Sequence, residues 1–119
     1  MADKGFNKKD ESLVDLLVNT GMPKNVAKTL AFMRKKEETT SVEIEIMTAL
    51  RQPEVSIAMQ ELRRRKWVIK RDIKKEGKGR PVHAYKLAIP FEKIIETIEK
   101  GIESIERNIE QLKALSQSP

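Results

Sequence analysis

Five side chains between residues 56 and 64 have the chemistry needed to read bases in a DNA duplex. Hydroxyl, amide and guanidinium groups can form hydrogen bonds with base edges in the major groove, and an aliphatic tip can contact the thymine methyl group. The outer face of any surface helix also carries polar groups, so a solvated helix that binds no nucleic acid is the alternative. The five residues are Ser56, Ile57, Gln60, Arg63 and Arg64.

A helix is expected to position these side chains, because apolar residues recur between them. These residues are Val55, Ala58, Met59 and Leu62. Their i, i+3, i+4, i+7 spacing places them on the side that faces a core and leaves the polar set on the other side. Pro53 cannot continue a preceding helix but suits the first position of a new one, so a turn is predicted at Arg51 and Gln52.

A shorter helix before this turn completes a helix-turn-helix pattern. Thr40 and Glu43 have the spacing of a capping box, in which the hydroxyl accepts an amide hydrogen of the new helix and the carboxylate reaches back to the cap. Ile44, Met47 and Leu50 then recur at intervals of three, which gives one buried face over about three turns.

A β-hairpin is predicted after the second helix. Trp67–Ile69 and Ile73 favour one strand, and residues 82–87 favour a second. The segment between them, KKEGKGRP, contains Gly77 and Gly79, which supply the flexibility that a turn needs.

The tip of this hairpin carries two basic residues. Pro81 disfavours the α conformation at Arg80, so Arg80 is expected to extend from the tip with Lys78 beside it. An extended arginine suits a narrow minor groove, where the negative potential is strongest. His83 follows on the returning strand, within reach of a phosphate. The alternative for this segment is a charged turn that only confers solubility.

Residues 40–87 resemble the winged helix-turn-helix of archaeal and bacterial transcription regulators, the broad ArsR, MarR and TrmB-like group. The matching segments are RQPEVSIAMQEL, RRRKWVIKRD and GKGRPVHAYKL, and the flanks match in pattern only, over roughly residues 10–115. The resemblance implies a mainly α (α+β) fold with a small β-hairpin. It also implies DNA-contact roles for Ser56, Ile57, Gln60, Arg63, Arg64 and Arg80. From their positions at the turn and the wing, the further candidates for DNA binding are Thr40, Gln52, Lys78 and His83.

The basic residues are concentrated on this predicted DNA-binding segment. The chain has 119 residues and a formal charge of +6. Residues 61–86 hold 11 Lys and Arg against 3 acidic residues, or +8, whereas residues 91–119 hold 4 against 6, or −2. A basic cluster of this kind is typical of phosphate binding.

The sequence lacks the residues that several other functions require. It contains no cysteine, which excludes disulfides and thiol chemistry. His83 is the only histidine, and no glycine-rich phosphate loop is present, so we expect no enzymatic activity, no metal and no cofactor. No segment is apolar enough for a membrane span or a signal peptide, so a cytoplasmic protein without a membrane partner is expected.

The last segment has the pattern of a helix that pairs with another helix. Its apolar residues alternate four and three positions apart, which is a heptad seam. These residues are Phe91, Ile95, Ile98, Ile102, Ile105, Ile109 and Leu112. A second copy of the chain would cover the seam and form a two-fold dimer, and folding back onto the chain's own domain is the alternative. The pattern does not settle whether the paired helices run parallel or antiparallel.

The expected organisation is a flexible N-terminus (1–9), a winged helix DNA-binding domain (10–90) and a C-terminal dimerisation helix (91–119). In the scaffold, Asp10 or Ser12 is expected to cap a first helix that ends at Gly21, and Pro23 opens a second that runs through Lys35. The first should bury Leu13, Leu16, Leu17 and Thr20, and the second should bury Val26, Ala27, Leu30, Ala31 and Met33.

These features together predict a homodimeric regulator that binds double-stranded DNA, with repression by promoter occlusion as the simplest mechanism. The alternative is a winged-helix protein-interaction module within a transcription or repair assembly, because a fold does not fix a function. Neither the operator nor any small-molecule effector is indicated by the sequence.

Overall fold

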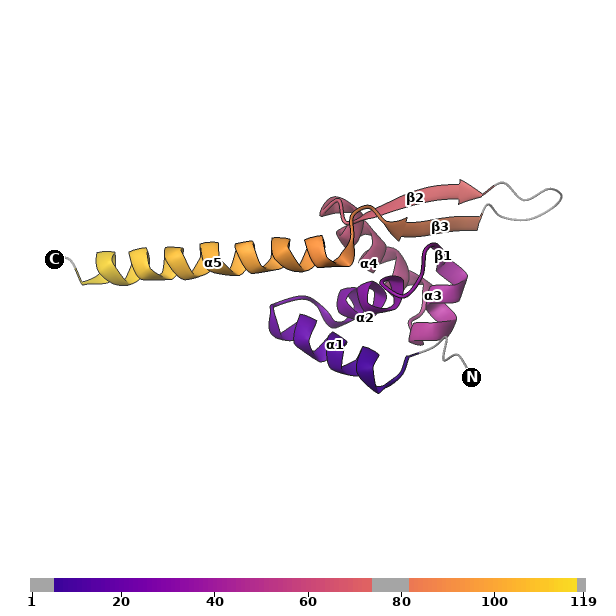
Figure 1. Cartoon of the computed structure of the whole chain (residues 1–119), viewed down its shortest axis with the longest axis horizontal. Helices are drawn as coiled ribbons and strands as arrows, with labels where there is room; N and C mark the ends of the chain where they lie inside the picture. Colours follow the sequence, from indigo (N-terminus) through magenta and orange to yellow (C-terminus); the bar gives the residue numbers. More distant parts are fainter. Residues whose placement is uncertain (1–5, 74–81, 118–119) are drawn as a thin grey trace. The chain divides into compact units, whose positions relative to one another are not determined.

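The chain forms five helices and three short strands in a computed structural model that describes residues 6–73 and 82–117 (Figure 1). The chain divides into two compact units, Met1–Ile89 and Pro90–Pro119, which we describe one at a time. The first unit contains α1 (Lys8–Asn19), α2 (Lys24–Met33), β1 (Thr39–Thr40), α3 (Ser41–Thr48), α4 (Gln52–Arg64), β2 (Val68–Ile73) and β3 (Val82–Leu87). The second contains α5 (Phe91–Ser116). The predicted winged helix-turn-helix fold is confirmed.

The core of the first unit lies among its helices, with α2 in contact with α1, α3 and α4. The fully buried side chains of α2 include Leu30 and Phe32, which pack in a core with Ile44 of α3 and with Met59 and Leu62 of α4. This burial of large apolar groups stabilises the arrangement that holds α4 in place.

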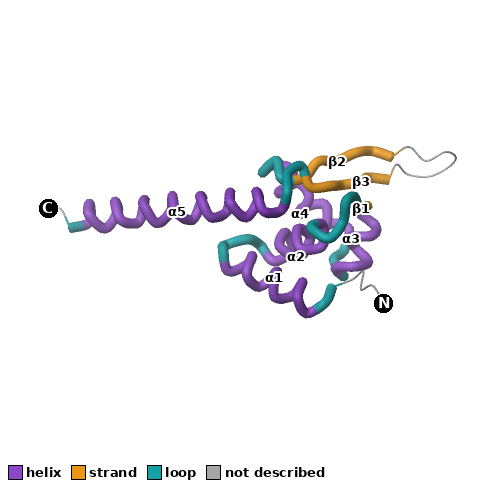
Figure 2. The backbone as a smooth tube through the Cα atoms, viewed as in Figure 1, coloured by secondary structure: helices purple, strands orange, loops and turns teal. Residues whose placement is uncertain are grey.

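A three-stranded antiparallel sheet covers one end of this core, in the order β1-β3-β2 (Figure 2). The hairpin of β2 and β3 was predicted, and its register pairs Val68 with Leu87 and Lys70 with Tyr85. Strand β1 was not predicted, because two residues are too short to show a β pattern. It pairs Thr39 with Tyr85 and so joins the start of α3 to the hairpin.

Helix α1 begins earlier than predicted. Its cap is Asn7, whose side-chain oxygen accepts a hydrogen bond of 2.9 Å from the amide of Asp10, so neither Asp10 nor Ser12 is the cap. The buried residues of α1 are Asp10, Val14 and Leu17, at i, i+4 and i+7, and Leu16 lies beside this stripe and is 63% exposed. Gly21 follows the last turn with φ +101°, a conformation that glycine adopts without strain.

Asp10 instead joins α1 to the end of α2. Its buried carboxylate accepts hydrogen bonds from Arg34 Nη2 (3.0 Å) and Lys35 Nζ (2.8 Å). Burial alone would raise the pKa of Asp10, but the hydrogen bonds from Lys35 and from the Asn7 amide lower it below its ordinary value. These cations lie past the end of α2, which stops at Met33 rather than at Lys35.

The turn between α3 and α4 also differs from the prediction. The chain reverses at Ala49, which has the left-handed φ of +58°, and Leu50 is buried behind it. Arg51 then caps α4, so Gln52 is the first helical residue and Pro53 the second. Because Ala49 is left-handed, the chain changes direction there, before the predicted turn at Arg51 and Gln52. Gln52 therefore belongs to α4, and its side chain lies on the surface of that helix.

The second unit is a helix of 26 residues, which is about 39 Å long at 1.5 Å per residue. It spans the predicted segment, and most of its apolar seam is exposed: Ile102 is 38% exposed, Ile105 57% and Leu112 64%. Among the described residues, no helix is both long and apolar enough to cross a membrane.

Candidate nucleic-acid interface

Helix α4 presents the predicted set of polar side chains on its exposed side. Its apolar residues Val55, Ala58, Met59 and Leu62 are buried. The exposed residues of the opposite side are Gln52, Ser56, Ile57, Gln60, Arg63 and Arg64. This division follows from the 3.6-residue period, which sends the two sets of side chains in opposite directions.

A cleft of about 210 Å³ lies between this side of α4 and the sheet. Its lining comes from four elements: the first residue of α3, residues of α4, and strands β2 and β3. The lining residues are Ser41, Gln52, Val55, Ser56, Met59, Gln60, Arg63, Lys70, His83 and Tyr85. The fold therefore gathers Gln52, Ser56, Gln60, Arg63 and His83 from the predicted set at one place.

Sequence reasoning missed three residues of this cleft: Ser41, Lys70 and Tyr85. Lys70 and Tyr85 are paired in the strand register, so they lie on the same face of the sheet. Burial raises the pKa of the Tyr85 hydroxyl, and the charge of the nearby Arg63 acts in the opposite direction. The available signal was that residues 83 and 85 lie two apart on one strand and so share a face, but without the register the sequence could not place Lys70 beside them or either strand beside α4.

The Arg64 side chain is hydrogen-bonded to a carboxylate of the same helix, which competes with DNA for its guanidinium group. Glu61 accepts hydrogen bonds of 2.6 Å from Arg64 Nη2 and from Arg65 Nε. These two hydrogen bonds lower the pKa of Glu61 to about 2, so its carboxylate stays ionised at neutral pH. In the described part of the chain, by contrast, no carboxylate forms an ion pair with Arg63. Arg63 is therefore better placed than Arg64 to bind a phosphate or a base.

On the hairpin, His83 is held by a carboxylate. Its Nδ1 lies 2.7 Å from Oδ1 of Asp72, its partner in the strand register, and Lys70 Nζ lies 3.9 Å from the same oxygen. Asp72 thus orients the imidazole ring and offsets part of the positive charge of the wing.

Of the four remaining candidates for DNA binding, the structure describes two. Thr40 caps α3, because its hydroxyl oxygen accepts a 3.1 Å hydrogen bond from the amide of Glu43. Ile57 projects an apolar side chain that is 65% exposed. Lys78 and Arg80 lie outside the described residues. Among the residues that are described, no cluster of histidine and carboxylate side chains is suited to hold a metal.

No protein-family model matches the sequence, and no curated protein gives a significant match. Among solved structures, the chain is similar to a possible transcriptional regulator from Methanosarcina mazei Go1, with a TM-score of 0.70 and 13% identity over 87% of this chain and 86% of that one. It is also similar to a transcriptional regulator homologue from Pyrococcus horikoshii OT3, with a TM-score of 0.51 and 14% identity over 87% and 97% of the two chains. At these identities the likeness establishes the fold.

Proposed function

We propose that this protein is a transcription regulator that binds double-stranded DNA as a homodimer. In this proposal residues 10–90 bind DNA and residues 91–119 dimerise. The observation that carries it is the exposed side of α4, where hydroxyl, amide and guanidinium groups lie at one cleft with the cationic strands of the hairpin. The names of the two structural neighbours support the proposal.

The major groove is the site that we propose for α4. Ser56, Ile57 and Gln60 would contact base edges, since they are exposed on successive turns and a groove about 12 Å wide admits one helix. Arg63 would bind a phosphate or a guanine. Gln52 at the start of α4 and Thr40 at the start of α3 would contact the DNA backbone, as side chains at helix N-termini often do.

The hairpin would contact the DNA backbone or the minor groove. Lys70 and His83 lie at the cleft beside α4, so they can reach phosphates that flank the groove occupied by that helix. Lys78 and Arg80, at the tip, remain candidates from the sequence alone. Affinity would arise mainly from these cations and specificity from α4, and repression by blocking a promoter is the simplest consequence.

Dimerisation would occur through the exposed seam of α5. Ile102, Ile105, Ile109 and Leu112 form an apolar stripe, and such a stripe on a soluble protein marks a contact surface. A second copy supplies an identical stripe and produces a two-fold dimer, which matches a palindromic operator whose half-sites lie about 34 Å apart.

The direction of the paired helices can be measured by cross-linking, because the chain contains no cysteine. In a parallel pair residue 95 meets its own copy, so Ile95→Cys alone would form a covalent dimer under oxidation. In an antiparallel pair with full overlap residue 95 meets residue 112, so only the double variant Ile95→Cys with Leu112→Cys would do so. A monomer at micromolar concentration would contradict dimerisation altogether.

DNA binding is tested with duplex DNA at several salt concentrations. The logarithm of the affinity should fall with the logarithm of the salt concentration, with a slope of about 0.9 per phosphate contact. Selection from a random duplex library would then yield the operator and the half-site spacing. If the protein binds no duplex DNA even in dilute buffer, the alternative of a winged-helix protein-interaction module replaces the proposal.

A further inference from the structure

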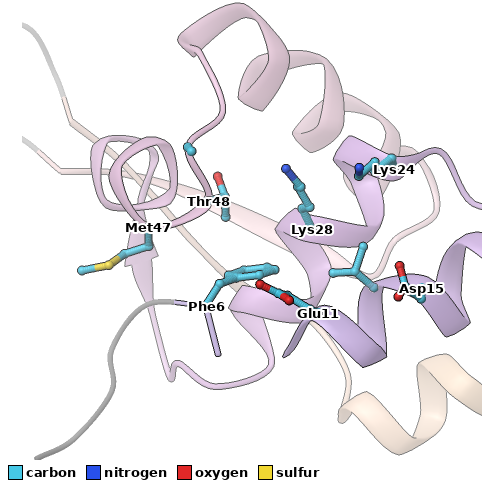
Figure 3. Close-up of a pocket in the computed structure, with 9 residues that line it drawn as sticks. Phe6, Glu11, Asp15, Lys24, Lys28, Met47 and Thr48 are labelled. Carbon is cyan, nitrogen blue, oxygen red and sulfur yellow. The ribbon is translucent and has the colours of Figure 1, made fainter. Parts of the chain in front are cut away.

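A second cleft lies on the first unit, and none of the described residues that line it is proposed to bind DNA (Figure 3). Its volume is about 420 Å³, which is within the range of small-molecule sites, roughly 300–1,000 Å³. It is formed by the segment before α1, by α1 and α2, and by the end of α3 with the turn that follows. The lining residues are Phe6, Glu11, Val14, Asp15, Lys24, Lys28, Met47, Thr48 and Ala49.

The charged residues of this cleft are one basic pair and one acidic pair. Lys24 and Lys28 are four residues apart on α2, and Glu11 and Asp15 are four residues apart on α1, so each pair shares one face of its helix. In Figure 3 the two ammonium groups lie toward the top of the view and the two carboxylates below them. Within the described residues, none of the four forms a salt bridge.

Apolar side chains complete the cleft. Phe6, Val14 and Met47 come from three different segments and offer an aromatic ring, a branched aliphatic group and a thioether chain. A ligand that satisfies all three kinds of lining needs one anionic group, one cationic group and one apolar group. An α-amino acid with an apolar side chain is the simplest molecule with these properties.

We propose that this cleft binds a free apolar α-amino acid. The ligand carboxylate would be bound by Lys24 and Lys28, its ammonium group by Glu11 and Asp15, and its side chain by Phe6, Val14 and Met47. Charged hydrogen bonds at both ends would discriminate against ligands that lack either charge.

The position of the cleft connects it to the helix-turn-helix. Thr48 ends α3 and Ala49 begins the turn that leads into α4. Ala49 has a left-handed backbone, and the Thr48 hydroxyl accepts a 3.4 Å hydrogen bond from the amide of Leu50. A ligand in contact with these residues would stabilise one conformation of the turn. The amino acid would thereby change the affinity for DNA, a regulatory role that rests on the proposed function.

Calorimetry with four probes tests the binding itself. L-leucine should bind saturably at millimolar concentration, and so should L-phenylalanine. Leucinamide lacks the carboxylate and 4-methylpentanoate lacks the ammonium group, so each should bind roughly tenfold more weakly than leucine.

Two variants test which residues of the cleft bind each charged group of the ligand. Lys24→Gln with Lys28→Gln should remove the advantage of leucine over leucinamide, and Asp15→Asn should reduce the advantage of leucine over 4-methylpentanoate. Lys9→Gln is the matched control, because Lys9 is exposed on α1 and does not line the cleft. It should leave all four affinities unchanged.

The proposal is overturned if leucine and phenylalanine produce no saturable binding, or if the cleft variants bind leucine as the control does. Repeating the DNA titration with leucine present separates the two proposals. Leucine binding without any DNA binding would refute the proposed function and support the amino-acid site. DNA binding without leucine binding would support the proposed function and refute the amino-acid site.

Discussion

Helices α4 and α5 are both amphipathic, but they expose opposite faces. In α4 the apolar residues are buried and the polar ones are exposed, whereas in α5 the apolar seam from Ile102 to Leu112 is exposed. A helix whose apolar face packs against the core of its own chain presents polar groups that can recognise a ligand. A helix whose apolar face is not buried in its own chain exposes apolar area that favours association. Under the proposed function, recognition of DNA and assembly of the dimer would therefore be carried out by different helices.

The largest effect is expected from a charge in the seam of α5. Ile105→Glu should weaken dimerisation by about 100-fold or more, because pairing would bury an ionised carboxylate without a partner. Sedimentation equilibrium measures the dissociation constant. Ser104→Glu is the control, since residue 104 lies outside the seam, and equal dissociation constants for the two variants would show that the stripe is not the interface.

The next effect is expected at Arg63 of α4. Arg63→Ala should weaken binding to all duplexes by roughly tenfold and reduce the salt slope by about one, because one phosphate contact is lost. Fluorescence anisotropy at several salt concentrations measures both quantities. Arg107→Ala on α5 is the control, and a slope that stays the same in Arg63→Ala would exclude this phosphate contact.

A smaller, selective effect is expected at Gln60. Gln60→Ala should reduce the preference for the operator over random DNA by about fivefold or more, because an amide that reads a base edge is removed. The affinity for random DNA should change little. Competition between labelled operator and random duplex measures the ratio, and equal losses on both would place base reading elsewhere.

The smallest effect is an increase in affinity. Glu61→Gln removes the carboxylate that binds Arg64 and Arg65, so affinity for all duplexes should rise about two- to threefold, as expected for an exposed ion pair. Because the pKa of Glu61 is about 2, the gain should stay constant from about pH 5 to about pH 8. Glu110→Gln on α5 is the control, and a gain that shrinks as the pH falls toward 5 would contradict this explanation, because it would mean that Glu61 becomes protonated there.

The sequence predicted the elements well where one period dominates. The buried and exposed faces of α4 follow from residues 55–64 alone, and α5 follows from its heptads. The start of α1 was predicted three or five residues too late and that of α4 one residue too late. Asn7 and the left-handed Ala49 act through local geometry that residue type only weakly specifies.

The sites were less predictable than the elements. Lys70 and Tyr85 join the cleft beside α4 only through the register of β2 and β3. The second cleft draws on segments from Phe6 to Ala49, and no spacing within any one of them indicates a site. Convergence of distant segments is a property of the packing, so it becomes visible only in three dimensions.

The strand order β1-β3-β2 makes β2 an outer strand, and this has a consequence for solubility. Outer strands have unpaired backbone groups that can join the sheets of neighbouring molecules and start aggregation. In β2 the exposed central residues are Ile69, Lys70, Arg71 and Asp72, and the three charges among them disfavour such pairing. Lys70, which we propose to bind phosphate, therefore also helps to protect the outer edge of the sheet, and neutralising the charges of β2 would make the protein prone to precipitate.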